Sequence, residues 1–220
     1  MANALVISRL QKSFGNRRLL DLSDLSFEPG ELHLLVGDNG VGKTTFLKIL
    51  AGLEKADAVH VALSGSVFDG GAFPASMRRD VVYVHQHPYL FSSSIEANIA
   101  YGLKIRELAA PARNAAVREA MQWAALESAK DVLPKRLSGG EKQRVALARA
   151  MVLNAPVMLV DEPTASLDAT ARDQVKALLA TMRAEGRIVL IATHDPAMLA
   201  LPGAVIWDLA GGKLTRRKDG

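Results

Sequence analysis

The chain contains no cysteine among its 220 residues, which excludes disulfide bonds and metal sites built from thiolates. This composition is compatible with the cytosol. A long hydrophobic run is missing as well, because the longest uncharged apolar stretch, residues 196–207, is far shorter than the roughly 18 residues that a membrane span needs. If the protein works at a membrane, we expect another chain to cross it.

A strong charge of either sign is also absent, since the formal net charge is only +4. Much of the basic excess lies in the tail KLTRRKDG, residues 213–220. A solvated tail is the simpler interpretation, and a weak preference for anionic lipid headgroups is the alternative. The first 18 residues lack the basic-then-apolar order of a signal peptide, so we expect no targeting segment. No repeat or low-complexity linker divides the chain, which predicts one domain over residues 1–220.

Short apolar runs alternate with helical patterns over much of the chain. Apolar runs at residues 31–37, 156–163 and 187–195 predict buried strands, whereas residues 43–52 and 168–186 predict helices. This order favours an α/β fold with a parallel sheet. Polar residues then fall at the carboxyl ends of the strands, where ligands bind in such folds.

Three segments depart from this alternation. Residues 1–30 and 59–85 carry short β-like runs separated by glycine and proline, and they suggest an antiparallel flank that includes the run DVVYVHQ at residues 80–86. Residues 104–153 are rich in helix formers. We interpret that segment as a helical lobe inserted between two halves of the sheet.

The stretch GDNGVGKTT, residues 37–45, matches the phosphate-loop pattern G-x-x-x-x-G-K-[ST] between a predicted strand and a predicted helix. Its glycines let backbone N–H groups face phosphate oxygens, Lys43 adds a positive charge, and the Thr44 hydroxyl can bind Mg²⁺. A glycine turn with a surface lysine is the alternative. The residues expected to contact ATP here are Gly37, Asp38, Asn39, Gly40, Val41, Gly42, Lys43, Thr44 and Thr45.

The run VMLVDE, residues 157–162, ends a predicted strand in two carboxylates. Consecutive strand residues point to opposite faces, so Asp161 and Glu162 can serve different ligands. Beside a phosphate loop, Asp161 is suited to anchor Mg²⁺ and Glu162 to act as the general base toward a water molecule. Taken alone, the pair could also be a solvated turn before Pro163.

The stretch KRLSGGEKQRVALARA, residues 135–150, begins a strongly helical run with a serine and two glycines. Ser138 and Glu141 have the spacing of a capping box, which predicts a helix start at Ser138. Gly139 and Gly140 leave that helix end bare, so that something can approach closely. We expect a bare helix start with a free serine hydroxyl to bind phosphate, and an ordinary capped helix is the alternative.

Together these motifs resemble the nucleotide-binding subunit of an ATP-binding cassette (ABC) transporter. The resemblance rests on LSGGEKQR, preceded by the phosphate loop and followed by LVDEPTASLD, and it extends from Phe14 to His194. It implies a P-loop NTPase (RecA-like) core with a mostly parallel sheet and an antiparallel β flank, at about residues 1–87 and 155–220, and a helical subdomain at about residues 94–153.

The resemblance implies ATP and Mg²⁺ as ligands, and it implies a homodimer in which two cassettes pack head to tail. In that arrangement the segment LSGGEKQR of each chain, which is called the signature segment in this family, faces the γ-phosphate of the ATP held by the other chain. The residues that would act in trans are Ser138, Gly139, Gly140 and Asp168.

Further site residues follow from matching positions. Phe14 matches the aromatic residue that stacks on adenine, and a core position in the flank is its alternative. Gln86 matches the glutamine that reaches Mg²⁺ and the attacking water; His85 and His87 beside it would form a metal pair only with a third ligand, which is lacking. His194 matches the switch histidine at the γ-phosphate. Asp168 matches a loop at the dimer interface and can also cap the following helix. The expected catalytic residues are Glu162, His194, Gln86 and Lys43, and the expected Mg²⁺ ligands are Thr44, Gln86 and Asp161.

As a function, the resemblance implies an ATPase that powers an importer. It implies peripheral binding to transmembrane permease subunits at the cytoplasmic face of the inner membrane, an external substrate-binding protein, and no nucleic acid. The alternative is a soluble or regulatory ATPase of the same family. We expect residues 88–99 to meet the membrane partner, unless Tyr89, Leu90 and Phe91 only pack between lobes.

Departures from the family pattern are small. Glu141 stands where many members have glutamine. Only 26 residues follow His194, so we expect no C-terminal regulatory domain, and 51 residues between Gln86 and Ser138 are too few for a coiled-coil insertion. Residues 83–103 are similar to ATPases of tungstate and phosphate importers, but the cargo itself contacts other subunits.

Overall fold

A computed structural model of the protein describes residues 4–70, 73–165 and 167–217. The chain divides into two compact units. The first contains the residues up to Tyr83, residues Pro156–Glu162, and the residues from Met182 onward, whereas the second contains Val84–Ala155 and Pro163–Thr181. The last three residues of the basic tail lie outside the described range.

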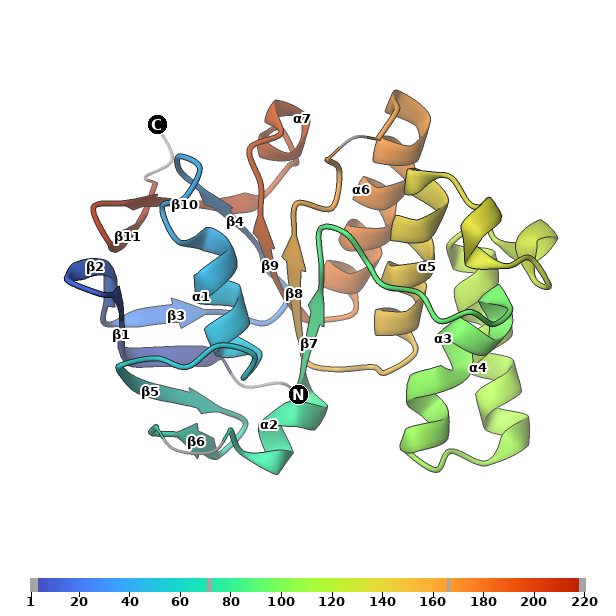
Figure 1. Ribbon diagram of the computed structural model, residues 1–220, viewed down its shortest axis with the longest axis horizontal. Coiled ribbons are helices and arrows are strands. Elements are labelled where there is room, and N and C mark those ends of the chain that lie inside the picture. Colours follow the sequence, from blue (N-terminus) through green and yellow to red (C-terminus); the bar gives the residue numbers. More distant parts are fainter. Residues whose placement is uncertain (1–3, 71–72, 166, 218–220) are drawn as a thin grey trace. The chain divides into compact units, whose positions relative to one another are not determined.

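A six-stranded sheet carries the first unit (Figure 1). Its strands, in spatial order, are β11 (Lys213–Arg216), β10 (Ala204–Ala210), β4 (Leu32–Val36), β9 (Ile188–Ala192), β8 (Val157–Asp161) and β7 (Val81–Val84). The pairs β10–β4, β4–β9 and β9–β8 are parallel, and β10–β11 is antiparallel. Strands β4, β8 and β9 are buried throughout, as expected of a parallel sheet covered on both faces. Helix α1 (Lys43–Leu50) contacts β8 and β9.

An antiparallel sheet forms the flank. Its strands are β2 (Arg17–Leu22), β1 (Leu5–Phe14), β5 (Ala58–Leu63), β6 (Ser66–Phe68) and β3 (Leu25–Phe27), with β3 paired to β1. Along β5 every second residue is buried, because one face of this sheet packs on the core. The short helices α2 (Ala75–Asp80) and α7 (Pro196–Leu199) complete the first unit. The predicted α/β class with a mostly parallel sheet and an antiparallel flank is confirmed.

One strand was assigned to the wrong sheet. The run at residues 80–86 was expected in the antiparallel flank, but β7 lies beside β8 at the end of the six-stranded sheet. The sheet of this run is decided by its pairing with β8, a strand distant in the sequence, and not by the local pattern of the run itself. This position brings the Tyr83 side chain to the carboxyl end of β8, which matters for the site described below.

The second unit is helical. Its helices are α3 (Ile95–Ile105), α4 (Ala110–Trp123) and α5 (Gly139–Met151), with 3₁₀ turns at Glu127–Ala129 and Pro134–Arg136. These helices share a core of their own that includes Ile99, Val117 and Val145. Helix α6 (Ala169–Ala184) starts in the second unit and ends in the first. Within the described residues, no helix is long and apolar enough to span a bilayer.

The predicted ends of α6 are confirmed. The Asp168 carboxylate accepts a hydrogen bond from the Ala171 backbone N–H at 2.8 Å, which satisfies a donor of the first helical turn. Gly186, at the other end, has a φ of 77°, a conformation that glycine adopts without strain.

The two glycines at the start of α5 differ in their surroundings. A Cβ atom added at Gly140 would lie 2.9 Å from the Ala171 Cβ of α6, whereas one added at Gly139 meets nothing within 4 Å. Gly140 is therefore required by the close packing of two helices in the second unit, and Gly139 is not.

This contrast predicts opposite effects of the same substitution. Gly139→Ala should leave the free energy of unfolding unchanged or raise it by up to about 1 kcal/mol, because alanine favours the helix. Gly140→Ala should lower it by about 1–3 kcal/mol, because the added methyl group overpacks the contact with Ala171. Urea unfolding of the two variants measures both, and an equal response at the two positions would contradict this assignment.

A buried histidine links the two sheets of the first unit. His33 on β4 is fully buried, accepts a hydrogen bond at Nδ1 from the Trp207 indole at 3.2 Å, and meets the edge of Phe27. Burial lowers the pKa of His33 to about 4, although the nearby Glu28 carbonyl opposes this shift. The ring is therefore neutral at pH 7.

Since the unfolded chain binds this proton more readily, folding stability should fall as the pH drops from 6.5 toward 4. Between pH 7 and 4.5, His33 should account for a loss of about 2–3 kcal/mol in the free energy of unfolding. The measurement is urea unfolding of wild type and His33→Gln at both pH values, in which the variant should lose less. His60→Gln, at a partly exposed ring, is the control and should behave as wild type.

Candidate nucleotide site

The phosphate loop joins β4 to α1 in a conformation that requires glycine. Gly37, Gly40 and Gly42 have φ values of 145°, 76° and 116°. A Cβ at Gly37 would collide with the Leu209 carbonyl, and one at Gly42 would lie 2.9 Å from the Leu20 side chain. The loop therefore passes close to neighbouring chain segments, and its residues 37–40 are exposed.

Lys43 lies inside this loop. Its side-chain amine donates to the Gly37 carbonyl at 2.6 Å and to the Asp38 carbonyl at 3.2 Å, and only 7% of the residue is exposed. No side chain caps the first turn of α1, which begins directly after Gly42. The uncapped N–H groups and the lysine charge make this helix start suited to an anion.

Thr44 and Asp161 meet although 117 residues separate them in the sequence. The Thr44 hydroxyl donates to Asp161 Oδ1 at 3.0 Å, and Asp161 Oδ2 accepts from the Tyr83 hydroxyl at 2.9 Å. Asp161 is 3% exposed. The pKa of Tyr83 is raised, mainly because the Tyr83 hydroxyl is buried and also because the negative charge of Asp161 lies beside it. The hydroxyl and carboxylate oxygens of Thr44 and Asp161 are of the kind that Mg²⁺ prefers.

Glu162 has an unusual backbone and an incompletely paired side chain. Its φ is 45°, which is uncommon for a residue other than glycine, and its N–H donates to the Ala192 carbonyl at 2.9 Å. Its Oε1 lies 2.9 Å from His194 Nδ1, while its Oε2 is buried and has no hydrogen-bond partner among the described residues. An ionised carboxylate only accepts, so when Glu162 is ionised this contact requires a proton on His194 Nδ1. Oε2 is an acceptor available to a further donor such as water.

The expected free hydroxyl at Ser138 is wrong for this structure. The Ser138 hydroxyl donates to Glu141 Oε2 at 2.8 Å and also accepts from the Glu141 backbone N–H at 3.2 Å. The Ser138 backbone N–H donates to the same carboxylate, and these bonds hold the pKa of Glu141 below its usual range. The predicted capping box is confirmed, and it occupies the hydroxyl. The N–H groups of Gly139 and Gly140 remain in the first turn, where intrahelical acceptors are lacking.

Phe14 ends β1 and is 54% exposed, so the alternative of a core position is wrong. The hairpin that carries it passes close to the phosphate loop, since a Cβ added at Gly42 would lie 2.9 Å from the Leu20 side chain and 3.1 Å from that of Leu19. This contact places an exposed aromatic ring on the element next to the start of α1.

The remaining expected site residues belong to the second unit: Gln86, Ser138, Gly139, Gly140 and Asp168. Their approach to any nucleotide, within one chain or between two, stays a prediction. A metal pair at His85 and His87 finds no support, since no group of three or more His, Cys, Asp or Glu side chains among the described residues is arranged to hold a metal ion.

Sequence reasoning missed two residues. Tyr83 was read only as part of a flank strand, and nothing in its surroundings along the sequence indicates a bond to Asp161. Asn98, on α3, is fully buried and its amide organises the loop before that helix: it accepts from the Phe91 N–H at 2.8 Å and donates to the Phe91 and Ser94 carbonyls. A polar residue on the otherwise apolar face of α3 was the available signal.

Comparison with known proteins agrees with this geometry. The ABC transporter family profile matches residues 20–165. The Fe(3+) ions import ATP-binding protein FbpC 3 of Rhodococcus jostii is 39% identical over 96% of this chain and 61% of its own length. The tungstate uptake system ATP-binding protein TupC of Peptoclostridium acidaminophilum is 36% identical over 87% of both chains. The chain thus spans about three fifths of the iron-import relative.

Among solved structures, CbiO1 of Clostridium perfringens, part of the ABC transporter complex CbiONQ, superimposes with a TM-score of 0.85 at 26% identity. The match covers 98% of this chain and 88% of that one. Both units of the chain thus have counterparts in that protein. From its profile match, its relatives and its fold, the chain belongs to the ABC transporter family.

Proposed function

We propose that the chain binds and hydrolyses ATP as the motor subunit of a membrane importer. The observation that carries this proposal is the contact of Thr44 with Asp161 at the phosphate loop, with Glu162 and His194 paired beside it. Relatives named as import ATP-binding proteins for ferric ions and tungstate support the importer class. The two relatives are about equally similar to this chain, yet their names give different cargoes. We therefore propose that the membrane subunits, and not this chain, select the cargo.

In the proposed site, residues 37–45 bind the phosphates, and Phe14 stacks on adenine. Thr44 and Asp161 would hold Mg²⁺, joined by Gln86 from the second unit. Mg²⁺ would offset the charge of the phosphate oxygens. Of the two carboxylates, Asp161 is engaged by Thr44 and Tyr83, whereas Glu162 keeps an unpaired oxygen. Glu162 is therefore the residue suited to accept a proton from the attacking water.

His194 would orient this base. Its Nδ1–H would donate to Glu162, and 66% of its side chain is exposed. A neutral imidazole has only one N–H, and here that N–H is used in the hydrogen bond to Glu162. Donation to a γ-phosphate from this ring then requires either a second proton at Nε2 or exchange of the bond to Glu162.

The function is tested by Glu162→Gln. The variant should retain ATP affinity, because Lys43, Thr44 and Asp161 are unchanged, while steady-state turnover should fall by about 10²–10⁴. Glu119→Gln, on the exposed side of α4, is the matched control and should keep wild-type turnover. Hydrolysis by Glu162→Gln at the wild-type rate would remove Glu162 from the role of base, and absence of ATP binding by wild type would refute the motor function.

We further propose that two copies assemble head to tail, with Ser138, Gly139, Gly140 and Asp168 of one chain completing the site of the other. The support is the family membership together with the N–H groups of Gly139 and Gly140, which the capping box at Ser138 does not use. In this arrangement each site combines the phosphate loop of one subunit with the signature segment of its partner.

Mixed dimers of two inactive variants test this arrangement. When a Lys43→Ala subunit pairs with a Ser138→Arg subunit, one composite site collects both defects and the other is intact. Differently tagged mixed dimers should therefore trap nucleotide, which neither parent homodimer does. If verified mixed dimers trap none, Ser138 serves only as a helix cap in its own chain.

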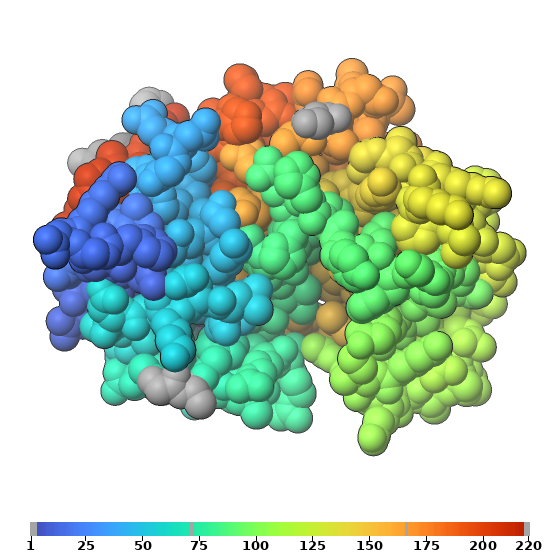
Figure 2. All heavy atoms as spheres, in the orientation of Figure 1, coloured from blue at the N-terminus to red at the C-terminus, as the bar shows by residue number. Residues whose placement is uncertain are grey.

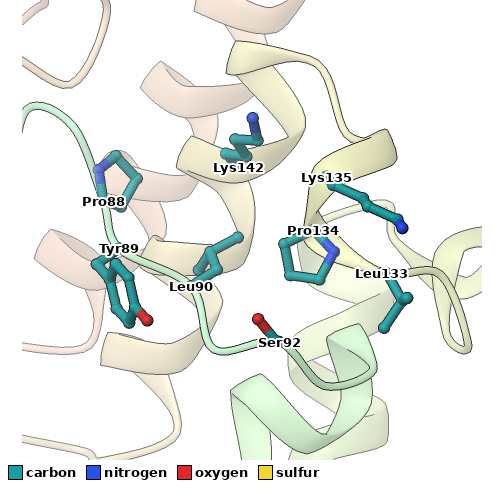
Figure 3. A pocket seen from close by; sticks show the side chains of 8 residues that line it. All are labelled: Pro88, Tyr89, Leu90, Ser92, Leu133, Pro134, Lys135 and Lys142. Atoms are coloured by element: carbon teal, nitrogen blue, oxygen red, sulfur yellow. The ribbon is translucent and has the colours of Figure 1, made fainter.

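A groove of about 420 Å³ on the second unit is our proposed docking surface for the membrane subunits (Figure 3). Pro88, Tyr89, Leu90 and Ser92, in the loop held by Asn98, form one side, and Leu133, Pro134 and Lys135 form another. Tyr89 and Leu133 are exposed apolar residues. Neither Lys135 nor Lys142 pairs with a carboxylate within the described residues, so we propose as occupant a helix end of the permease that carries acidic residues.

Cysteines placed singly at residues 88–92 of this cysteine-free chain should crosslink to the permease. Replacing Lys135 and Lys142 together with glutamine should weaken co-purification with the permease, whereas the same change at Lys104 and Lys130, outside the groove, should not. If none of these cysteines crosslinked to the permease, the docking surface would have to lie elsewhere on the chain. Failure to co-purify with any polytopic membrane protein would instead favour a soluble or regulatory ATPase.

A further inference from the structure

Lys12 lies against the ring of Phe14 at the end of β1. The Lys12 amine is 4.6 Å from the ring centroid, within the range of a cation–π interaction. The two residues differ sharply in exposure, with Lys12 at 8% and Phe14 at 54%. The ring thus has one face toward a buried cation, while much of its surface is exposed.

The Lys12 amine is held from the other side. It donates to Glu54 Oε1 at 2.7 Å and to the Lys55 carbonyl at 2.8 Å. Both acceptors lie in the loop between α1, which ends at Leu50, and β5. Two strong acceptors restrict a long and otherwise mobile side chain, so the cation has a defined position below the ring.

The local backbone explains why the two side chains meet. Residues 12 and 14 are two apart on a strand, so they share a face. The register of β1 against β2 shifts between Lys12 and Ser13 because Leu19 is an extra residue on β2, so the alternation along β1 is kept. The hairpin then packs on the loop at Gly42 through Leu19 and Leu20. Figure 2 shows the blue atoms of this hairpin directly beside the light-blue atoms of the loop and α1.

We propose that Lys12, held by Glu54, is a positioning residue that fixes Phe14 as a platform for the adenine base. The inference rests on the proposed nucleotide site. An exposed aromatic ring at a hairpin end loses rotamer freedom when a base stacks on it, and a ring already held by Lys12 loses less. The cation also draws ring electron density toward itself, which makes the free face less negative toward the π-face of a purine.

The test compares a ligand that has a base with one that lacks it. Calorimetry would measure the affinities of ATP and of inorganic tripolyphosphate for wild type, Lys12→Met and Lys12→Arg. Lys12→Met should weaken ATP binding about fivefold and leave tripolyphosphate binding unchanged, because only the base contacts Phe14. Lys12→Arg keeps a cation for both Glu54 and the ring, so its ATP affinity should be close to that of wild type. Lys55→Met, at an exposed neighbouring side chain, is the matched control.

A Phe14→Ala background supplies the second readout. Phe14→Ala alone should weaken ATP binding about tenfold, and Lys12→Met should then cause no further loss. If Lys12→Met does not fold, Glu54→Gln takes its place, with a smaller ATP-specific loss expected.

Several results would overturn the inference: an equal loss for both ligands, unchanged ATP affinity in Lys12→Met, or additive losses in the Phe14→Ala background. Failure of the proposed function is distinguishable, since wild type would then bind neither ligand or Lys43→Ala would have no effect on either.

Discussion

The hydrogen bond between Thr44 and Asp161 is the constraint around which the nucleotide site is arranged. It joins the first turn of α1 to the end of β8, and these two elements can meet only because β4 and β8 flank β9 in a parallel sheet whose carboxyl ends share one edge. The same edge carries Glu162 and His194, and β7 adds Tyr83. A sheet of different strand order would separate these side chains even with every motif intact.

Much of this arrangement could be predicted from the sequence, for identifiable reasons. Strands β4, β8 and β9 are nearly continuous apolar runs bounded by polar residues, a pattern typical of buried parallel strands. The capping box at Ser138 and the cap at Asp168 are local, since donor and acceptor lie within a few residues of each other. Local chemistry of this kind is readable in a linear sequence.

What failed depends on partners distant in the chain. The apolar run of β7 differs from the alternating pattern of β5, but strand pairing decides its sheet, and the bond from Tyr83 to Asp161 spans 78 residues. From the sequence, Gly140 suggested a bare helix end. In the structure, glycine is needed at this position because Ala171 of another helix packs closely against it. The cation below Phe14 depends likewise on Glu54, 42 residues away, and no spacing rule connects them.

The capping box at Ser138 bears on how two copies would separate. Glu141 brings a carboxylate to the helix start, where it accepts hydrogen bonds from the Ser138 hydroxyl and from the Ser138 backbone N–H. A phosphate oxygen of a partner's ATP would compete with this carboxylate for the same hydroxyl and would meet like charge while doing so. Breaking such a cap costs about 1 kcal/mol. In the proposed head-to-tail dimer, Glu141 would thus be an anionic competitor for the Ser138 hydroxyl, which would weaken the closed pair and favour its release once the γ-phosphate is gone.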